Sequence, residues 1–338
     1  MIHLPSLPWD DKAWQGHLRD SVKSAQELAA LLNLSTHSLT WINDSDFPLF
    51  VPKNFVKRME IGNPHDPLLR QIVPIEDELR LVNGFSVEPL NESKYSPSSG
   101  LIQKYDGRVL VITSSACPVH CRYCFRRHFP YKDFRLDSLS QVLDYVSEDQ
   151  SIQEVILSGG DPLSVRDSVL ETFIQRLEQF KHVRILRFHT RFPIMIPQRI
   201  TSRLLRCFEA STLNIVVVLH ANHANEIDQD VETACVALLR SRVETLNQSV
   251  LLKGINDSHE ALVDLSYRLS DAKISPYYLH LLDRVQGAAH FEVSEVRAKT
   301  LVGEMQRRLP GYLVPRLVRE QPGQPSKTLY EPTAVESF

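Results

Sequence analysis

Three cysteines, Cys117, Cys121 and Cys124, lie close together just after an apolar stretch at residues 108–113. Thiolates are ligands for zinc and for iron–sulfur clusters. A structural zinc ion takes four ligands, so zinc would need a further ligand, which His120 or His128 could supply. Three thiolates suit an iron–sulfur cluster in which one iron keeps an open coordination position. The sequence therefore predicts a metal centre held by three cysteines.

The other two cysteines, Cys207 and Cys235, lie in segments with helical periodicity. We expect both to be ordinary buried cysteines, which pack as small hydrophobic side chains. Five cysteines in 338 residues, three of them clustered, do not resemble the framework of a secreted disulfide-rich protein. A reducing compartment is the better expectation.

Composition narrows the class of protein and its partners. A hydrophobic content of 43% can form a large core, and the chain has no long uncharged apolar run of the kind that spans a membrane. A net charge of -3 gives no basic surface of the kind that binds nucleic acid. The first residues lack the basic and apolar regions of a signal peptide. These features predict a cytoplasmic protein that binds small molecules and has no membrane or nucleic-acid partner.

Short apolar runs alternate with longer amphipathic segments in the second part of the chain, which predicts repeated βαβ units and a parallel sheet. The runs cover residues 108–113, 153–157, 183–189, 214–220, 243–252, 277–282 and 312–318. Most of their residues are apolar, as expected for strands buried on both faces. An open doubly wound sheet and a partial barrel both fit. In either fold the functional residues should follow the strands, at their carboxyl ends.

The first part of the chain has a different pattern. Residues 10–34 have helical spacing, and proline-rich segments follow to about residue 99. We therefore predict a helical N-terminal appendage at residues 1–99, a sheet-forming domain at 100–319 and a C-terminal segment at 320–338.

The C-x3-C-x2-C spacing, with an aromatic residue before the last cysteine, resembles the radical S-adenosylmethionine superfamily. The resemblance implies a 4Fe-4S cluster on the three cysteines, with S-adenosylmethionine on the fourth iron. The glycine-rich stretch at residues 157–162 is similar to the superfamily motif that contacts the methionyl amine. Residues in two later strands resemble further contacts to S-adenosylmethionine. The cofactor contacts implied are Ser158, Gly159, Gly160, Asp161, His220 and Gln248.

A second resemblance concerns the C-terminal segment. Lys327 in "GQPSKTLYEP", with "KYDGRVLVIT" and "PYYLHLLDRVQGAAHF" upstream, resembles the lysine 2,3-aminomutases. These radical enzymes also use pyridoxal phosphate, bound covalently by a lysine that Lys327 matches. Lys104, Tyr105 and Arg108 match the phosphate-binding segment, and two cations with a hydroxyl group are suitable chemistry for a phosphate.

The resemblance also implies how the substrate is bound. Arg126 matches the arginine that holds the substrate carboxylate, and Asp283 and Glu320 match the two acids that receive the ε-ammonium group. The sequence departs from the lysine-catabolising members of the family at three positions. Glu320 replaces aspartate, His280 replaces tyrosine and Lys104 replaces arginine.

Within the family, "NPHDPLLRQ", "CRYCFRRHFPY" and "GYLVPRLVRE" resemble most the branch that serves elongation factor P, as does the short end after Lys327. The resemblance implies a partial (β/α)6 barrel that converts (S)-α-lysine to (R)-β-lysine. A lysyl ligase then attaches β-lysine to elongation factor P, and an electron donor of unknown identity reduces the cluster. Two alternatives remain open. One is a radical S-adenosylmethionine enzyme without pyridoxal phosphate, such as an activase of another protein, and the other is a non-catalytic zinc or iron–sulfur module.

Overall fold

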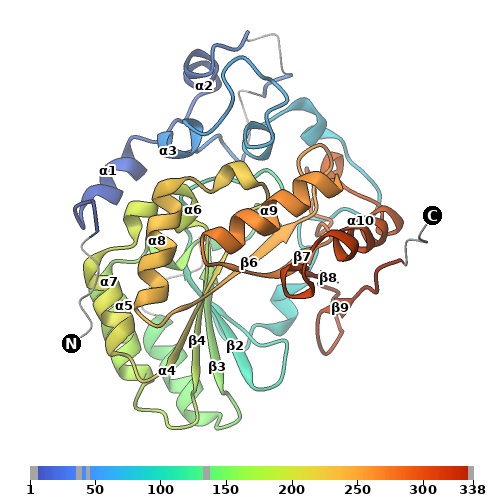
Figure 1. Ribbon diagram of the computed structural model, residues 1–338. Helices are drawn as coiled ribbons and strands as arrows, with labels where there is room; N and C mark the ends of the chain where they lie inside the picture. The colour runs from blue at the N-terminus through green and yellow to red at the C-terminus, as the bar shows by residue number, and fades with distance from the viewer. Residues whose placement is uncertain (1–6, 36–39, 43–45, 132–137, 334–338) are drawn as a thin grey trace.

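A single sheet organises the structure, a computed structural model that describes residues 7–35, 40–42, 46–131 and 138–333 (Figure 1). Neighbouring strands in this sheet follow chain order from β1 to β9. Their bounds are β1 Leu101–Ile102, β2 Arg108–Ser114, β3 Glu154–Gly159, β4 Ile185–Thr190, β5 Asn214–Leu219, β6 Glu244–Val250, β7 Ser275–His280, β8 Arg316–Arg319 and β9 Thr328–Leu329. Each of the seven predicted apolar runs overlaps one strand, from β2 to β8.

Strands β2 to β8 run parallel, whereas β1 and β9 pair antiparallel at the two edges. Six helices form the crossovers between consecutive parallel strands, because parallel pairing requires a return segment. They are α4 Ser138–Glu148, α5 Asp167–Leu177, α7 Ser202–Ala210, α8 Gln229–Arg240, α9 His259–Asp271 and α10 Glu295–Arg308. The α/β class and the six strand–helix units are confirmed. Strand β8 adds a seventh parallel strand to the six that the resemblance implied.

Burial along the strands corrects one expectation. In β3 the five residues after Glu154 are all buried, but in β4 and β6 buried side chains alternate with half-buried ones. The half-buried positions include Arg187, His189 and Gln248, which line an internal cavity. These strands are therefore not buried on both faces. One face packs against the helices and the other surrounds space for ligands.

Side-chain caps start several crossover helices. Thr201, Asp228, Ser258 and Ser294 each accept a hydrogen bond from a backbone N–H in the first turn of α7, α8, α9 and α10. Such caps satisfy donors that the helix itself leaves without partners. The caps fix the start of each of these helices, and with it the end of the loop that leads from the preceding strand.

The N-terminal region is only partly as predicted. Residues 10–34 form two helices, α1 Ala13–Arg19 and α2 Ala25–Leu31, and not one. Between them Val22 pairs with Val51, and Ser24 caps α2 through the Glu27 N–H. A non-local backbone pairing thus overrides the helical spacing. The short helix α3, Lys53–Val56, follows.

The N-terminal region also shares its core with the sheet. Trp14, Leu28 and Phe55 belong to the same hydrophobic cluster as Val109 and Val155 of β2 and β3. The predicted appendage and C-terminal segment include residues 1–6, 36–39, 43–45 and 334–338, which lie outside the described residues. No helix in the described ranges is long and apolar enough to cross a membrane.

Candidate active site

A cavity of about 460 Å³ opens at the carboxyl ends of the strands, and its volume suits a small molecule or cofactor. Every residue that the sequence assigned to the site lines this cavity. These residues are Lys104, Tyr105, Arg108, Cys117, Cys121, Cys124, Arg126, Ser158, Gly159, Gly160, Asp161, His220, Gln248, Asp283, Glu320 and Lys327. The structure therefore brings the predicted residues together, while their individual roles stay predictions.

One end of the cavity, called here the thiol end, consists of the three cysteines, Gly159, Gly160, Asp161 and Arg191. The main chain after β3 lies directly against the start of the cysteine loop. Gly160 N donates to Ser114 O at 2.7 Å, and a Cβ on Gly160 would stand 2.5 Å from Ala116 O. Gly159 has a φ of +115°. Glycine is required at both positions, because a side chain would force the two loops apart.

Asp161 joins three strand ends at this place. Its buried carboxylate accepts hydrogen bonds from Leu163 N at 2.9 Å, Thr190 Oγ1 at 2.7 Å and Arg191 N at 2.7 Å. Burial raises the pKa of Asp161 to about 6, although these hydrogen bonds oppose the shift. The Asp161 N–H donates to Ala116 O at 2.8 Å. The carboxylate is thus occupied by protein donors that fix the loop after β3 to the loop after β4.

The three thiols are free and lie on one short loop, so their chemistry fits an iron–sulfur cluster. Burial raises the pKa of the Cys117 thiol well above its usual value and that of Cys124 to about 11. Cys121 Sγ instead accepts a hydrogen bond from Arg191 Nη1 at 2.6 Å. Across the described ranges, no three His, Cys, Asp or Glu side chains already surround one metal position.

The two histidines considered as zinc ligands point elsewhere. His120 stacks on Phe47 with ring centroids 4.6 Å apart, and its Nδ1 lies 2.8 Å from Pro48 O. His128 Nε2 lies 3.3 Å from Gln286 O. Neither imidazole lines the cavity. This arrangement favours the three-cysteine set over a zinc site completed by histidine.

Arg126 lies between the thiol end and the rest of the cavity. Its guanidinium binds the buried Glu92 carboxylate through two contacts, Nε at 2.9 Å and Nη2 at 2.7 Å. Nη1 donates to Ser158 Oγ at 3.0 Å. Glu92 begins the 3-10 helix η3, Glu92–Tyr95. One edge of the guanidinium is therefore held by the protein, and the Nη1 side is the part that lies beside the predicted cofactor contact Ser158.

The other end of the cavity, called here the lysine end, consists of Lys104, Tyr105, Asp283, Glu320 and Lys327. Antiparallel pairing of Arg319 with Thr328 brings the neighbouring Glu320 and Lys327 opposite each other. Lys327 Nζ donates to Glu320 Oε2 at 2.5 Å.

Glu320 receives further donors at its other oxygen. Tyr105 donates its hydroxyl hydrogen to Glu320 Oε1, and Lys104 Nζ stands 3.6 Å from the same oxygen. Burial alone would raise the pKa of Glu320, but Lys327 and the two other donors outweigh burial and lower it. Glu320 is therefore a charged carboxylate in a place that already accommodates two ammonium groups.

Asp283 differs from Glu320 in its hydrogen bonding. Its Oδ1 is buried and has no hydrogen-bond partner among the described residues. Burial, aided by the charge of Glu320, raises the pKa of Asp283 to about 7. His280 Nε2, also buried, has no partner within the described ranges either, and burial lowers the pKa of His280 to about 3. A buried polar atom without a partner is costly, so both side chains indicate a place for a ligand.

Two predicted contacts for S-adenosylmethionine bind each other. His220 Nε2 lies 2.9 Å from Gln248 Nε2, and the His220 ring lies 6.0 Å from the ring of His189. His189 was not predicted, although it also lines the cavity and its buried Nε2 has no partner in the described part of the chain.

Arg191 and Glu92 are the other residues that the sequence reasoning missed. Arg191 directly follows β4, so the expectation that functional residues follow strands could have found it. Nothing local in the sequence marks Glu92, because its ion pair with Arg126 joins segments 34 residues apart.

Comparison with known proteins identifies relatives over almost the full chain. Residues 111–266 match the Radical SAM superfamily. A protein of Escherichia coli (strain K12) named L-lysine 2,3-aminomutase is 45% identical, covering 97% of each chain. A Haemophilus influenzae protein of the same name is 42% identical over 97% of this chain and 98% of the relative. One from Acetoanaerobium sticklandii, also so named, is 31% identical over 99% of this chain and 81% of the relative.

Proposed function

The chain belongs to the L-lysine 2,3-aminomutase family, and we propose that it converts free (S)-α-lysine into (R)-β-lysine. The observation that carries this proposal is one cavity that combines three free thiols at one end with Asp283 at the other, whose buried Oδ1 has no hydrogen-bond partner among the described residues. The thiol end provides for radical initiation, and the lysine end provides for a cationic substrate.

Recognition of the ε-ammonium group is assigned to Asp283 and Glu320. An ammonium bound at Asp283 Oδ1 would give this buried atom its missing partner and would restore the charged carboxylate. Glu320 already binds the ammonium of Lys327, so its position suits a cation. Two carboxylates facing one ammonium group favour lysine over amino acids with shorter or uncharged side chains.

Recognition of the α-carboxylate is assigned to Arg126. Glu92 holds Nε and Nη2, which orients the guanidinium and leaves Nη1 beside Ser158. A substrate carboxylate would bind through Nη1 or would replace Glu92 on the fork. This assignment requires a free carboxylate and therefore favours free lysine over lysine already attached to a protein.

The cofactors proposed are a 4Fe-4S cluster on Cys117, Cys121 and Cys124, S-adenosylmethionine, and pyridoxal phosphate on Lys327. The fit of the thiols rests on their chemistry, and the fit of Lys327 on its position among Lys104, Tyr105 and Arg108. When bound, these groups would supply a carbon radical that abstracts hydrogen and a conjugated π-system that stabilises the unpaired electron while nitrogen migrates. The chain itself orients lysine, holds its two charged ends and excludes water from the cavity.

A finer proposal concerns the use of the product. The resemblance of "CRYCFRRHFPY" and "GYLVPRLVRE" to the branch that serves elongation factor P supports a cytoplasmic role in that modification. In this role a lysyl ligase would consume β-lysine, and a separate protein would donate the electron.

An anaerobic assay tests the function. Protein reconstituted with iron, sulfide and pyridoxal phosphate should convert isotopically labelled lysine to β-lysine in the presence of S-adenosylmethionine and reductant. Cleavage of S-adenosylmethionine without any β-lysine would instead favour an activase. Stoichiometric zinc without iron would favour the non-catalytic module.

Lys327→Ala separates the aminomutase from an enzyme without pyridoxal phosphate. The variant should lose the absorbance band of the lysine-bound cofactor together with β-lysine formation, while it keeps its iron. Lys299→Ala is a matched control, because Lys299 pairs with Glu295 on the surface of α10. An unchanged absorbance band in Lys327→Ala would refute the assignment of this lysine.

A further inference from the structure

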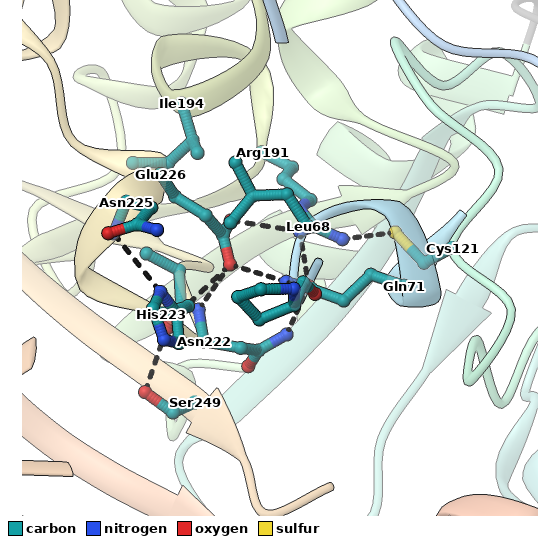
Figure 2. Close-up of polar contacts among 12 residues, drawn as sticks. Leu68, Gln71, Cys121, Arg191, Ile194, Asn222, His223, Asn225, Glu226 and Ser249 are labelled. Atoms are coloured by element: carbon teal, nitrogen blue, oxygen red, sulfur yellow. Dashed lines mark hydrogen bonds and ion pairs between the residues drawn. The ribbon is translucent and has the colours of Figure 1, made fainter. Parts of the chain in front are cut away.

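Arg191 makes a direct contact with one of the three thiols and has no role in the function proposed above. It stands at the start of α6, Phe192–Met195, immediately after β4, and its side chain is buried. Nη1 donates to Cys121 Sγ at 2.6 Å and to the Tyr123 hydroxyl oxygen at 2.6 Å. Figure 2 shows the guanidinium of Arg191 directed at the sulfur of Cys121.

The opposite side of the guanidinium is held by other segments. Nη2 donates to Gln71 Oε1 at 2.8 Å and to Glu226 Oε2 at 2.9 Å, and Glu226 is fully buried. Glu226 also accepts from Gln71 Nε2 at 2.9 Å, and Asn222 Nδ2 donates to Gln71 Oε1 at 2.9 Å (Figure 2). These partners come from the N-terminal region and from the loop after β5. The position of Arg191 is therefore determined by the fold and does not depend on Cys121.

We propose that Arg191 is a positioning residue that sets the reduction potential of the cluster bound by Cys117, Cys121 and Cys124. This inference rests on the proposed function for the presence of the cluster. A charged N–H donor to a ligand sulfur stabilises negative charge on the cluster, and hydrogen bonds to ligand sulfurs are a main determinant of cluster potentials. Reduction adds one electron from an external reductant and breaks no bond. Arg191 stabilises the reduced form more than the oxidised form and so raises the potential.

Glu226 limits the size of this effect without cancelling it. Its carboxylate neutralises part of the Arg191 charge, but it contacts Nη2, whereas the sulfur contacts Nη1. The hydrogen bond to the sulfur is thus directed and fixed. A purely structural arginine would influence folding stability but would leave the potential unchanged.

The test is a redox titration of the reconstituted protein, monitored by electron paramagnetic resonance, with dithionite as reductant and with iron and sulfide quantified. Arg191→Gln should shift the potential to a more negative value. Each tenfold loss in preference for the reduced form corresponds to about 59 mV for one electron. Arg191→Lys, which keeps the charge, should shift the potential less.

Arg199→Gln is the matched control. Arg199 is equally buried but donates to Leu163 O and Val165 O and pairs with Asp167. This variant should lower thermal stability and leave the potential unchanged. The same shift in both glutamine variants, or no shift in Arg191→Gln at full iron content, would overturn the proposal. Weaker binding of S-adenosylmethionine at an unchanged potential would overturn it as well.

Gln71→Met covers the case in which Arg191→Gln does not retain its cluster. This neutral substitution removes an acceptor of Nη2 and of the Tyr123 hydroxyl, which lies 3.4 Å from Gln71 Oε1, but it leaves the three cysteines and Arg191 in place. It should shift the potential in the same direction by a smaller amount. An unchanged potential in Gln71→Met would then overturn the proposal. The titration requires no lysine, so it is independent of aminomutase activity. Wild-type protein without iron would instead overturn the proposed function.

Discussion

The two ends of the cavity each contain one aspartate with a buried carboxylate oxygen, and the two aspartates differ in their hydrogen-bond partners. At the thiol end Asp161 accepts three hydrogen bonds that connect the loops after β3 and β4. At the lysine end Asp283 Oδ1 has no partner among the residues that the structure describes. Burial raises the pKa of both, to about 6 for Asp161 and about 7 for Asp283.

This difference in hydrogen bonding indicates that the two carboxyl groups have different functions. Asp161 uses its acceptors to hold the loops after β3 and β4 beside the three cysteines, so these contacts are structural. Asp283 has an acceptor left for a ligand, so the folded protein carries a cost that a bound cation relieves. The side-chain type is the same and each has a buried carboxylate oxygen, so the hydrogen-bond partners are the main difference between the two aspartates.

The largest effect is expected from substitutions that disrupt the thiol end and leave the lysine end intact. Replacing Cys117, Cys121 or Cys124 by Ala should abolish cluster assembly and cleavage of S-adenosylmethionine, because the proposed cluster would lose one of its three cysteine ligands. Iron content and 5'-deoxyadenosine formation measure the loss. Cys235→Ala is the control, since Cys235 is buried within α8 and does not line the cavity. Full cleavage activity in any one of the three variants would remove that cysteine from the ligand set.

The next largest effect is expected from a substitution that disrupts the lysine end and leaves the thiol end intact. Asp283→Asn should keep the fold, the cluster and reductive cleavage, but it should slow lysine turnover about thirtyfold to several thousandfold. This range corresponds to about 2–5 kcal/mol for removing one charged partner from a desolvated ammonium group. β-Lysine formation measured under saturating cofactors gives the result. Turnover within a factor of about two of wild type would mean that Asp283 does not bind the ε-ammonium.

A smaller effect, on the KM for lysine, is expected from a substitution of Arg126. Arg126→Lys should raise the KM for lysine about tenfold to a hundredfold, because one ammonium cannot replace the guanidinium fork that binds Glu92 and faces Ser158. Arg127→Lys is the matched control, since Arg127 pairs with Glu78 and does not line the cavity. Equal KM values for both variants would argue against Arg126 as the carboxylate ligand.

The smallest expected effect is on the pH dependence of folding stability, in which the two aspartates should differ. The usual carboxyl pKa of 3.8 rises to about 7 for Asp283, so the folded state binds more protons than the unfolded state between these values. The contribution of Asp283 to stability is therefore present at low pH and is lost as the pH rises towards 7. Facing charged groups that modify this titration are Glu320, Lys327, Lys104 and Glu92.

Thermal unfolding without ligands measures this pH effect. Asp283→Asn should raise the melting temperature above pH 7 by a few degrees at most. Asp161→Asn should lower it at the same pH, because the amide cannot accept from all three donors. A lower melting temperature for Asp283→Asn would contradict the contrast between the two aspartates.

The sequence predicted much of the sheet, because strands β2 to β8 contain apolar runs whose burial dominates their energetics. The break between α1 and α2 was not predictable in this way, because Val22 pairs with Val51, far along the chain. The half-buried positions of β4 and β6 were missed for a related reason. Their cavity exists only when all strands curve around it.

The site residues also divide into those that a local sequence pattern indicates and those that depend on non-local contacts. The three cysteines were predicted from their spacing, and Asp283, Glu320 and Lys327 from motifs that resemble a family, and all six line the cavity. Arg191 and Glu92 were not found, because their significance lies in contacts with Cys121 and Arg126 that only the folded chain creates. Local sequence patterns can suggest candidate ligands. The residues that orient these candidates become visible only in the folded structure.

The short edge strand β9 has a consequence for solubility. An exposed sheet edge is a template for pairing with other chains, and short antiparallel strands at both edges here, β1 and β9, cover the outer parallel strands. Strand β9 begins at Thr328, directly after Lys327. The backbone pairing that places Lys327 in the cavity also covers the edge of β8, which protects this strand from pairing with other chains. Substitutions that weaken this pairing would endanger catalysis and colloidal stability together.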